Sequence, residues 1–257
     1  MNDTRAGYGS DRSTISPSGL SAHSVPVRFL GWAALLFVAV VAPLSLWFSQ
    51  RSPAALVGTL TFGMIAVVAA RGLQQRYPHA RLGIANAITT LRAAIIAPFA
   101  VIIFVPAAFL TYPAFAWTVL ALALFSLTLD GVDGFFARRQ GLSSSFGARF
   151  DVEIDSLFAL ILALIAMQLD KAGAWVLVLG FARYAFVAAG LALPWLNAPL
   201  PERFTRKLVC VIQIAVLIGM LAPVVAGDIA LMLAACASGL LVWSFAVDII
   251  WLARQHR

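Results

Sequence analysis

The chain has 257 residues, of which 62% are apolar and only 11% are charged, and its mean hydropathy is +0.94. Soluble proteins carry roughly 25% charged residues, so this composition excludes an ordinary soluble domain and indicates an integral membrane protein. The net charge of +7 does not indicate nucleic-acid binding, because the basic residues fall in alternate loops and form no stripe with interleaved aromatic side chains.

Residues 1–27 are rich in Ser, Gly and Thr and contain few apolar groups. Such a segment cannot bury enough surface to fold alone, so we predict a disordered polar tail. The first apolar run begins too far from the N-terminus, and is too long, for the short apolar region of a cleaved signal peptide. We therefore expect this run to remain as a membrane anchor.

Apolar runs long enough to cross about 30 Å of membrane hydrocarbon recur along the rest of the chain. Each run predicts a helix, because lipid leaves no other open architecture with a satisfied backbone and no run alternates as a barrel strand does. We predict an all-α integral membrane bundle of about eight transmembrane helices, at 30–49, 54–71, 88–110, 113–130, 152–169, 174–195, 207–226 and 229–251.

Basic residues gather in alternate connections between the predicted helices. The intervening connections carry only Arg51 and Lys171. The positive-inside rule predicts that the basic connections and both termini face the cytoplasm. Those connections carry Arg71, Arg76, Arg81, Arg92, Arg138, Arg139, Arg149, Arg203, Arg206 and Lys207.

Four aspartates lie in the stretch DGVDGFFARRQGLSSSFGARFDVEID, residues 130–155. Asp130 and Asp133 are three residues apart, and Asp151 and Asp155 are four apart, so each pair projects from one face of a helix. The pairs flank a polar turn between two predicted spans, which can run antiparallel. We therefore expect the four carboxylates to converge at the cytoplasmic rim.

Converging carboxylates repel one another and are costly to place in a membrane, so this cluster needs a cation. Oxygen ligands suit hard ions, and four carboxylates are enough to hold two Mg²⁺ or Mn²⁺ ions. Glu153 is two residues from Asp151 and is expected to point away from the cluster. Between the pairs, glycines allow close backbone approach, and arginines and serines offer donors to phosphate oxygens, which favours a diphosphate ligand.

The spacing of these residues resembles the signature of CDP-alcohol phosphatidyltransferases, which reads DxxDGxxAR, eight residues, then GxxxDxxxD. Every fixed position matches here, through Asp130, Asp133, Gly134, Ala137, Arg138, Gly147, Asp151 and Asp155. Upstream, ANAITTLR resembles the family's PNxITxxR motif through Asn86, Ile88, Thr89 and Arg92. Ala85 stands in place of the usual proline.

The resemblance implies that residues 83–257 form the family's six-helix core, preceded by two additional N-terminal spans within residues 28–75. It also implies displacement of CMP from a CDP-linked lipid, usually CDP-diacylglycerol, by the hydroxyl of a small alcohol. Family members are commonly homodimers, so we expect one here. We expect it in a bacterial inner (cell) membrane, with the active site on the cytoplasmic side.

The same resemblance assigns roles to individual residues. Two metal ions would be held by Asp130, Asp133, Asp151 and Asp155. Asp155 would also be the general base for the acceptor hydroxyl. The CDP-lipid would contact Gly134, Ala137, Arg138, Ser144, Gly147 and Asn86.

Basic residues further along the chain bear on the acceptor. Arg183 lies mid-span in GFARYAFVAAG, where a charge is costly enough to indicate function, the alternative being a structural ion pair with Asp248. Lys207 and Gln213 have the spacing of the Kx(5)Q motif of phosphatidylglycerophosphate- and cardiolipin-type members. With Arg203 nearby, Arg183 and Lys207 favour a phosphorylated acceptor such as glycerol 3-phosphate.

Two other classes remain open at this point. UbiA-type membrane prenyltransferases also hold Mg²⁺ and diphosphate with Asp-rich motifs, but their two motifs lie far apart in the chain. A non-enzymatic membrane transporter would contain paired broken helices in two halves, and the sequence shows no such internal symmetry.

Overall fold

The computed structural model describes residues 24–79, 81–140, 144–201 and 203–256, and for residue 24 and residues 132–140 it describes the helical backbone alone. Within these ranges every regular element is a helix, which agrees with the predicted all-α class. Helix α1 begins at Ser24, inside the range predicted as a polar tail. Residues 1–23 lie outside the described residues, so disorder of that segment stays a prediction.

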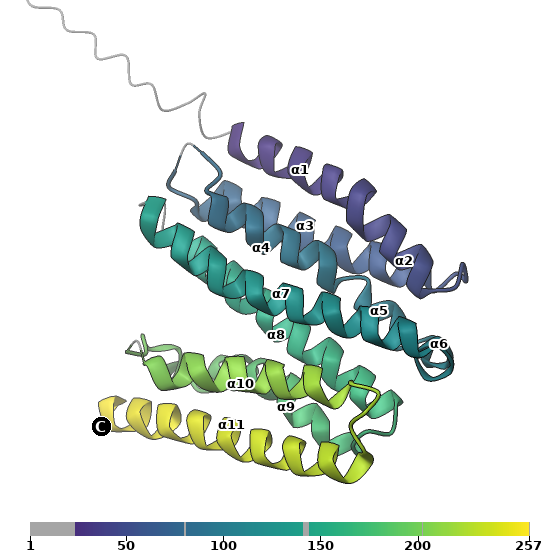
Figure 1. The fold of residues 1–257 in the computed structure, drawn as a ribbon. Helices are drawn as coiled ribbons and strands as arrows, with labels where there is room; N and C mark the ends of the chain where they lie inside the picture. Colours follow the sequence, from purple (N-terminus) through teal and green to yellow (C-terminus); the bar gives the residue numbers. More distant parts are fainter. Residues whose placement is uncertain (1–23, 80, 141–143, 202, 257) are drawn as a thin grey trace, which may run out of the picture.

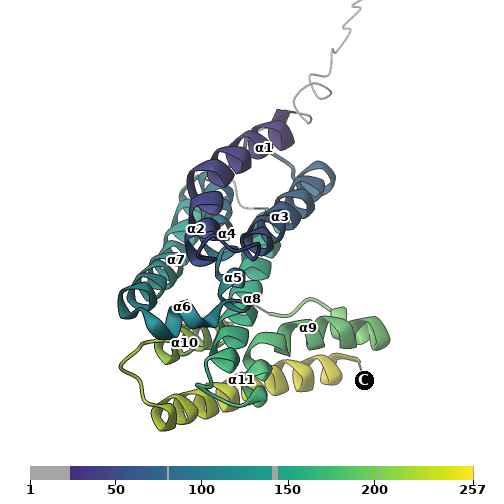
Figure 2. The same ribbon diagram turned by 90° about the vertical axis from the view of Figure 1, so that its right-hand side faces the viewer.

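Most of the helices are long rods that lie side by side in Figure 1. The N-terminal pair consists of α1 (Ser24–Leu36), a π-helical turn (Phe37–Val41), α2 (Ala42–Phe48) and α3 (Ala55–Arg76). The next helices are α4 (Ile84–Ile96), α5 (Phe99–Ile102), α6 (Pro106–Thr111), α7 (Pro113–Gln140) and α8 (Ser145–Gln168). The C-terminal part contains α9 (Leu177–Ala192), α10 (Phe204–Met220) and α11 (Gly227–His256), with 3₁₀ turns at Ala174–Val176 and Pro194–Asn197. Helix α8 crosses α9 and α11 at a steep angle in Figure 2.

Six of the helical rods in the described part of the chain are long and apolar enough to cross a membrane. The helices α8 and α10 fall in the other two predicted ranges. Helix α8 carries three acids in its first half, Asp151, Glu153 and Asp155, and α10 is 17 residues long. The fold is therefore that of an integral membrane helical bundle, consistent with the predicted number of about eight spans.

The range 88–110, predicted as one helix, is interrupted. Helix α4 ends at Ile96, α5 begins after Pro98, and α6 begins at Pro106. Proline lacks an amide hydrogen, and its ring clashes with the carbonyl four residues earlier, so a helix cannot continue through it undisturbed. The stretch Ile84–Ile102, which contains α4 and α5, is still long and apolar enough to cross a membrane, so the predicted span is confirmed over its first part and ends before residue 110.

Helix α8 lies at the centre of the bundle. It contacts α3, α4 and α5 on one side and α9 and α10 on the other (Figure 2). Gly180 of α9 permits one of these approaches, since a Cβ there would lie 2.8 Å from the Cα of Leu160 in α8.

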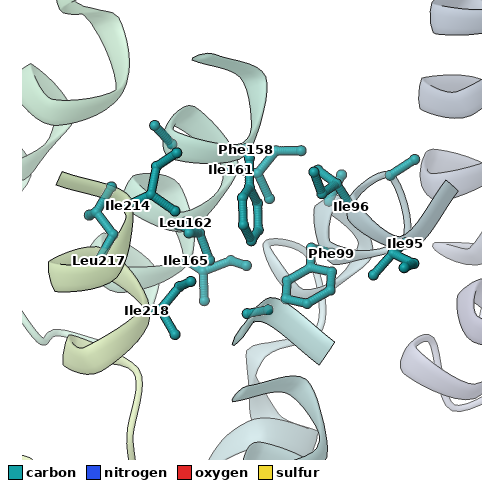
Figure 3. Close-up of a cluster of buried hydrophobic side chains, with 14 of the residues drawn as sticks. Ile95, Ile96, Phe99, Phe158, Ile161, Leu162, Ile165, Ile214, Leu217 and Ile218 are labelled. Carbon is teal, nitrogen blue, oxygen red and sulfur yellow. The ribbon is translucent and has the colours of Figure 1, made fainter. Parts of the chain in front are cut away.

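Branched and aromatic side chains of α8 fill the space on both of these sides. In Figure 3, Phe158 faces Phe99 and Ile96, while Ile165 lies toward Ile218 of α10. The Phe99 and Phe158 rings meet edge to face, with centroids 5.8 Å apart. This packing fixes the position of α8, and with it the position of the acids in its first turns.

Candidate active site

Three of the four aspartates converge where α7 and α8 approach each other. Asp130 lies in the second half of α7, and Asp151 and Asp155 lie one turn apart near the start of α8. One carboxylate oxygen from each lies within 4.8 Å of the others. The structure therefore brings these three predicted metal ligands together. Asp133 is on the helical backbone of α7, but its side chain is outside the described residues.

Arg92 of α4 lies among these carboxylates and has a fully buried side chain. Its Nη1 donates to Asp130 Oδ1 at 3.0 Å and to Asp151 Oδ1 at 2.6 Å, and its Nη2 donates to Asp155 Oδ1. Charge-assisted bonds of this kind are about twice as strong as neutral ones. Arg92 is thus the internal counter-ion that holds acids from two other helices in one place.

Sequence reasoning missed this role of Arg92. It placed the residue among the basic groups around a cytoplasmic connection, whereas the structure buries it within the bundle. A usable signal was present, because Arg92 also falls inside the predicted span 88–110, and a charge within a span needs a partner.

The charge and exposure of this cluster suit a divalent cation. Three carboxylates and one guanidinium leave a formal charge of −2, which one divalent ion neutralises. The Asp130 side chain is 9% exposed, whereas those of Asp151 and Asp155 are 30% and 23% exposed. A ligand would therefore approach from the α8 side, and oxygen donors are those that Mg²⁺ and Mn²⁺ prefer.

The start of α8 adjoins the start of α4. Ser144 is the N-cap of α8, and its hydroxyl accepts a 3.0 Å hydrogen bond from the Gly147 amide, which satisfies one of the open donors of the first turn. A Cβ on Gly147 would lie 2.9 Å from Oδ1 of Asn86, itself 5% exposed. Three of the residues predicted to contact the CDP-lipid are therefore neighbours. The other three, Gly134, Ala137 and Arg138, belong to the part of α7 for which the structure describes only the helical backbone.

Comparison with known proteins identifies the class. The family model described as CDP-alcohol phosphatidyltransferase matches residues 82–247. The chain belongs to the CDP-alcohol phosphatidyltransferase family. Comparison with curated proteins and comparison with solved structures each give no match.

Membership of the CDP-alcohol phosphatidyltransferases confirms the predicted class of enzyme. The match runs from just before α4 into α11, so it contains the whole aspartate cluster together with Arg92. An enzyme of this family transfers a phosphatidyl group from a CDP-linked alcohol in phospholipid synthesis, and the six apolar helices agree with a membrane location. The family favours this reading over a UbiA-type prenyltransferase or a transporter.

Arg183, predicted as an acceptor contact, pairs with an acid that sequence reasoning did not select. Its Nη2 lies 2.5 Å from Oε1 of Glu153, on α8. Asp248, the partner named in the structural alternative, instead pairs with Arg206 Nε at 3.2 Å and with Arg203 Nη1 at 4.0 Å. The alternative of an Arg183–Asp248 pair was therefore wrong. Glu153 is the one acid of this α8 turn outside the aspartate cluster, as its position two residues from Asp151 predicted.

The beginning of α10 presents positive charge toward the aspartates of the transferase. Lys207 lies within electrostatic range of Asp151, and Cys210, one turn later, lies within range of both Asp155 and Arg183. Gln213, the last position of the Kx(5)Q spacing, is buried, and its side-chain amide donates to the carbonyl of Leu179. Lys207 is therefore near the cluster, whereas Gln213 joins α10 to α9.

A small cavity of about 210 Å³ lies between the start of α10 and the second half of α11. The polar residues that line it are Arg203, Thr205, Arg206, Ser244 and Asp248. Arginine forks and hydroxyls are donors that phosphate oxygens accept. Asp248 already pairs with both arginines, so an anion bound here would share them with that carboxylate.

Proposed function

We propose that this enzyme transfers the phosphatidyl group of CDP-diacylglycerol to the hydroxyl of a small alcohol and releases CMP. The observation that carries the proposal is the convergence of Asp130, Asp151 and Asp155 on Arg92 inside the region matched by the family. The cluster provides acidic ligands for metal ions that would bind a diphosphate. A partly exposed carboxylate, Asp155, provides a base next to them.

The proposed metal site holds two divalent ions, Mg²⁺ or Mn²⁺. Asp130, Asp151 and Asp155 supply converging oxygens, and Asp133, three residues after Asp130, would complete the set. When bound, such ions neutralise the charge of the diphosphate and stabilise the leaving phosphate of CMP. Arg92 holds the three carboxylates close to one another, so these side chains would be available together to such ions.

In the proposed reaction, Asp155 accepts the proton of the acceptor hydroxyl. The hydroxyl oxygen then forms a bond to the lipid-bearing phosphorus, and the bond from this phosphorus to the oxygen shared with the CMP phosphate breaks. The CDP group would contact Gly134, Ala137, Arg138, Ser144, Gly147 and Asn86. Of these, Ser144, Gly147 and Asn86 adjoin one another at the start of α8.

A phosphorylated acceptor such as glycerol 3-phosphate is supported by the charges around α10. Lys207 lies within electrostatic range of Asp151, and Arg203 lines the cavity beside α11. Arg183, already paired with Glu153, contributes a third positive group on the same side of α8. We propose that the site faces the cytoplasm, because CMP is water-soluble and the acyl chains can stay in the bilayer. A homodimer in a bacterial inner membrane is proposed from the family resemblance alone.

The test is CMP release by the purified protein in detergent, with CDP-diacylglycerol and either Mn²⁺ or Mg²⁺. The acceptor panel contains glycerol 3-phosphate, serine, inositol, inositol phosphate and choline. We expect release that depends on one phosphorylated acceptor and stops when EDTA removes the metal. If only an unphosphorylated acceptor stimulated CMP release, the proposal that Lys207, Arg203 and Arg183 bind the phosphate of the acceptor would be rejected. If EDTA did not affect CMP release, the proposed metal site would be rejected.

Lys207→Met is expected to raise KM for the phosphorylated acceptor about tenfold or more, because one hydrogen bond between charged groups contributes roughly 1.5 kcal/mol or more. KM for CDP-diacylglycerol should change little. Arg51→Asn is the matched control, since it also removes one positive charge, from an exposed turn between α2 and α3 whose positive φ Asn tolerates. An unchanged acceptor KM in Lys207→Met would remove Lys207 from the acceptor site.

A further inference from the structure

The N-terminal helices α1, α2 and α3 lie outside the region matched by the family, residues 82–247. They nevertheless pack on the elements that carry the aspartate cluster and its counter-ion. Helix α1 contacts α4, and α3 contacts α4, α5 and α8 (Figures 1 and 2). Contacts at three places join this N-terminal unit to the starts of α4 and α8.

The first contact joins α1 to the start of α4. The indole Nε1 of Trp32 donates a 3.1 Å hydrogen bond to the carbonyl of Ala87. Ala87 follows Asn86 directly and precedes Arg92 by little more than one helical turn. The bond therefore ties α1 to the part of α4 that carries both of these side chains.

The second contact is between α3 and the first turn of α8. Gly72 lies against the ring of Phe146, so that a Cβ at this position would be 2.5 Å from Cε2 of the ring. Phe146 is 8% exposed and stacks on Phe150, with centroids 5.7 Å apart and an interplanar angle of 19°. Phe150 directly precedes Asp151. The contact at Gly72 thus fixes the position, along the axis of α3, of the α8 turn that carries Asp151.

The third contact uses one side chain to join both helix starts. The ring of Tyr77, just after α3, packs edge to face on Phe146 with centroids 6.1 Å apart. Its hydroxyl donates to the carbonyl of Arg81 at 3.0 Å and accepts from the amide of Gly83, the N-cap of α4, at 3.2 Å. Tyr77 therefore links the end of α3 to the starts of both α4 and α8.

We propose that the N-terminal unit is a positioning element of the active site. Through Gly72 and Tyr77, α3 sets how α8 lies against α4, and hence where Asp151 and Asp155 meet Arg92. The inference rests on the proposed metal site, and it assigns these helices a role beyond membrane anchoring. An anchor would need only apolar length, whereas these contacts are directed at the two helix starts beside the cluster.

The test compares two glycines of the same helix. Gly72→Leu places a side chain against the Phe146 ring, whereas Gly63→Leu meets nothing, since no heavy atom lies within 4 Å of a Cβ there. In the full chain in detergent, we expect the Kd for Mn²⁺ and the KM for CDP-diacylglycerol to rise at least tenfold in Gly72→Leu. A displacement of about 1 Å can cost as much as a hundredfold. Gly63→Leu should match the wild type in both.

A second substitution, Phe146→Ala, removes the ring that Gly72→Leu would strike, so the double variant should recover part of the Mn²⁺ affinity. If Gly72→Leu does not fold, Tyr77→Phe replaces it, because this change removes only the two hydroxyl contacts; its Mn²⁺ Kd should rise several-fold. Unchanged Kd and KM in a folded Gly72→Leu variant, or in Tyr77→Phe where Gly72→Leu fails, would overturn the positioning role even if thermal stability fell.

The two proposals fail in different ways. Absence of Mn²⁺ binding in the wild type would reject the metal site itself. In that case the KM for CDP-diacylglycerol would test whether the N-terminal helices position the active site. Equal KM values in Gly72→Leu and Gly63→Leu would reject that role. Tight Mn²⁺ binding in all variants would leave the metal site standing and reject the positioning role alone.

Discussion

Asp155→Asn is expected to lower the rate of CMP release by about 10²- to 10⁴-fold, which is the range that general-base catalysis contributes. The amide keeps the size of the carboxylate but cannot accept the proton of the acceptor hydroxyl. It also removes the negative charge from one of the three converging groups, so that a neutral amide oxygen is left as a weaker metal ligand and a weaker acceptor for the Arg92 guanidinium. We therefore expect Mn²⁺ binding to weaken together with kcat, while KM for the acceptor changes less.

The control for Asp155→Asn is Asp170→Asn, which removes a carboxylate just beyond the opposite end of α8. Asp170 has a φ of 52°, a conformation in which Asn is among the most favourable residues, so this exchange should leave folding intact. CMP release and Mn²⁺ titration are measured on both variants at the same protein concentration. Activity of Asp155→Asn within tenfold of the wild type would remove Asp155 as the base.

The positions of the helices could be predicted from the sequence largely because length and hydropathy decide them. A run of about twenty apolar residues has few alternatives in lipid, so α3, α7 and α11 fall where their apolar runs predict. The interruption after α4 also had a local cause in the sequence, Pro98, which was not used. Helix α8 extends to Ser145, before the predicted start at residue 152, because its first turns carry the polar cluster.

The aspartate cluster was predictable for a different reason. Spacings of three and four residues place side chains on one face of any helix, so the sequence predicts that Asp151 and Asp155 are neighbours on the surface of α8. Asp130 joins them because α7 and α8 both pack against α4 and α10.

Pairing between distant helices was not predictable in this way. Arg92 lies 38 residues before Asp130, and Arg183 lies 30 residues after Glu153. Which acid each arginine meets depends on the rotation of each helix about its axis and on its height in the bundle. The rotation and the axial position of each helix are set by close packing, such as that of Gly180 against Leu160. They cannot be read from the composition of the helix.

Arg92→Met is expected to destabilise the metal-free protein by about 3–5 kcal/mol, the usual effect of removing one partner from a buried ion pair. The guanidinium is fully buried, and it bonds three carboxylates that would otherwise repel one another. A divalent ion bound to the same oxygens would offset that repulsion. Mn²⁺ should therefore raise the Tm of Arg92→Met by more than it raises the Tm of the wild type.

Thermal unfolding in detergent, with EDTA or with Mn²⁺, tests this expectation. Arg92→Lys keeps the charge but loses the planar fork, so its Tm in EDTA should fall between those of the wild type and Arg92→Met. Arg183→Met is the control, because its pair with Glu153 is 31% and 49% exposed and such pairs contribute about 0–1 kcal/mol. If Arg92→Met kept the wild-type Tm in EDTA, Arg92 would not be the counter-ion of the cluster. If its Tm fell without recovery in Mn²⁺, the metal ion and the arginine would not share those carboxylates.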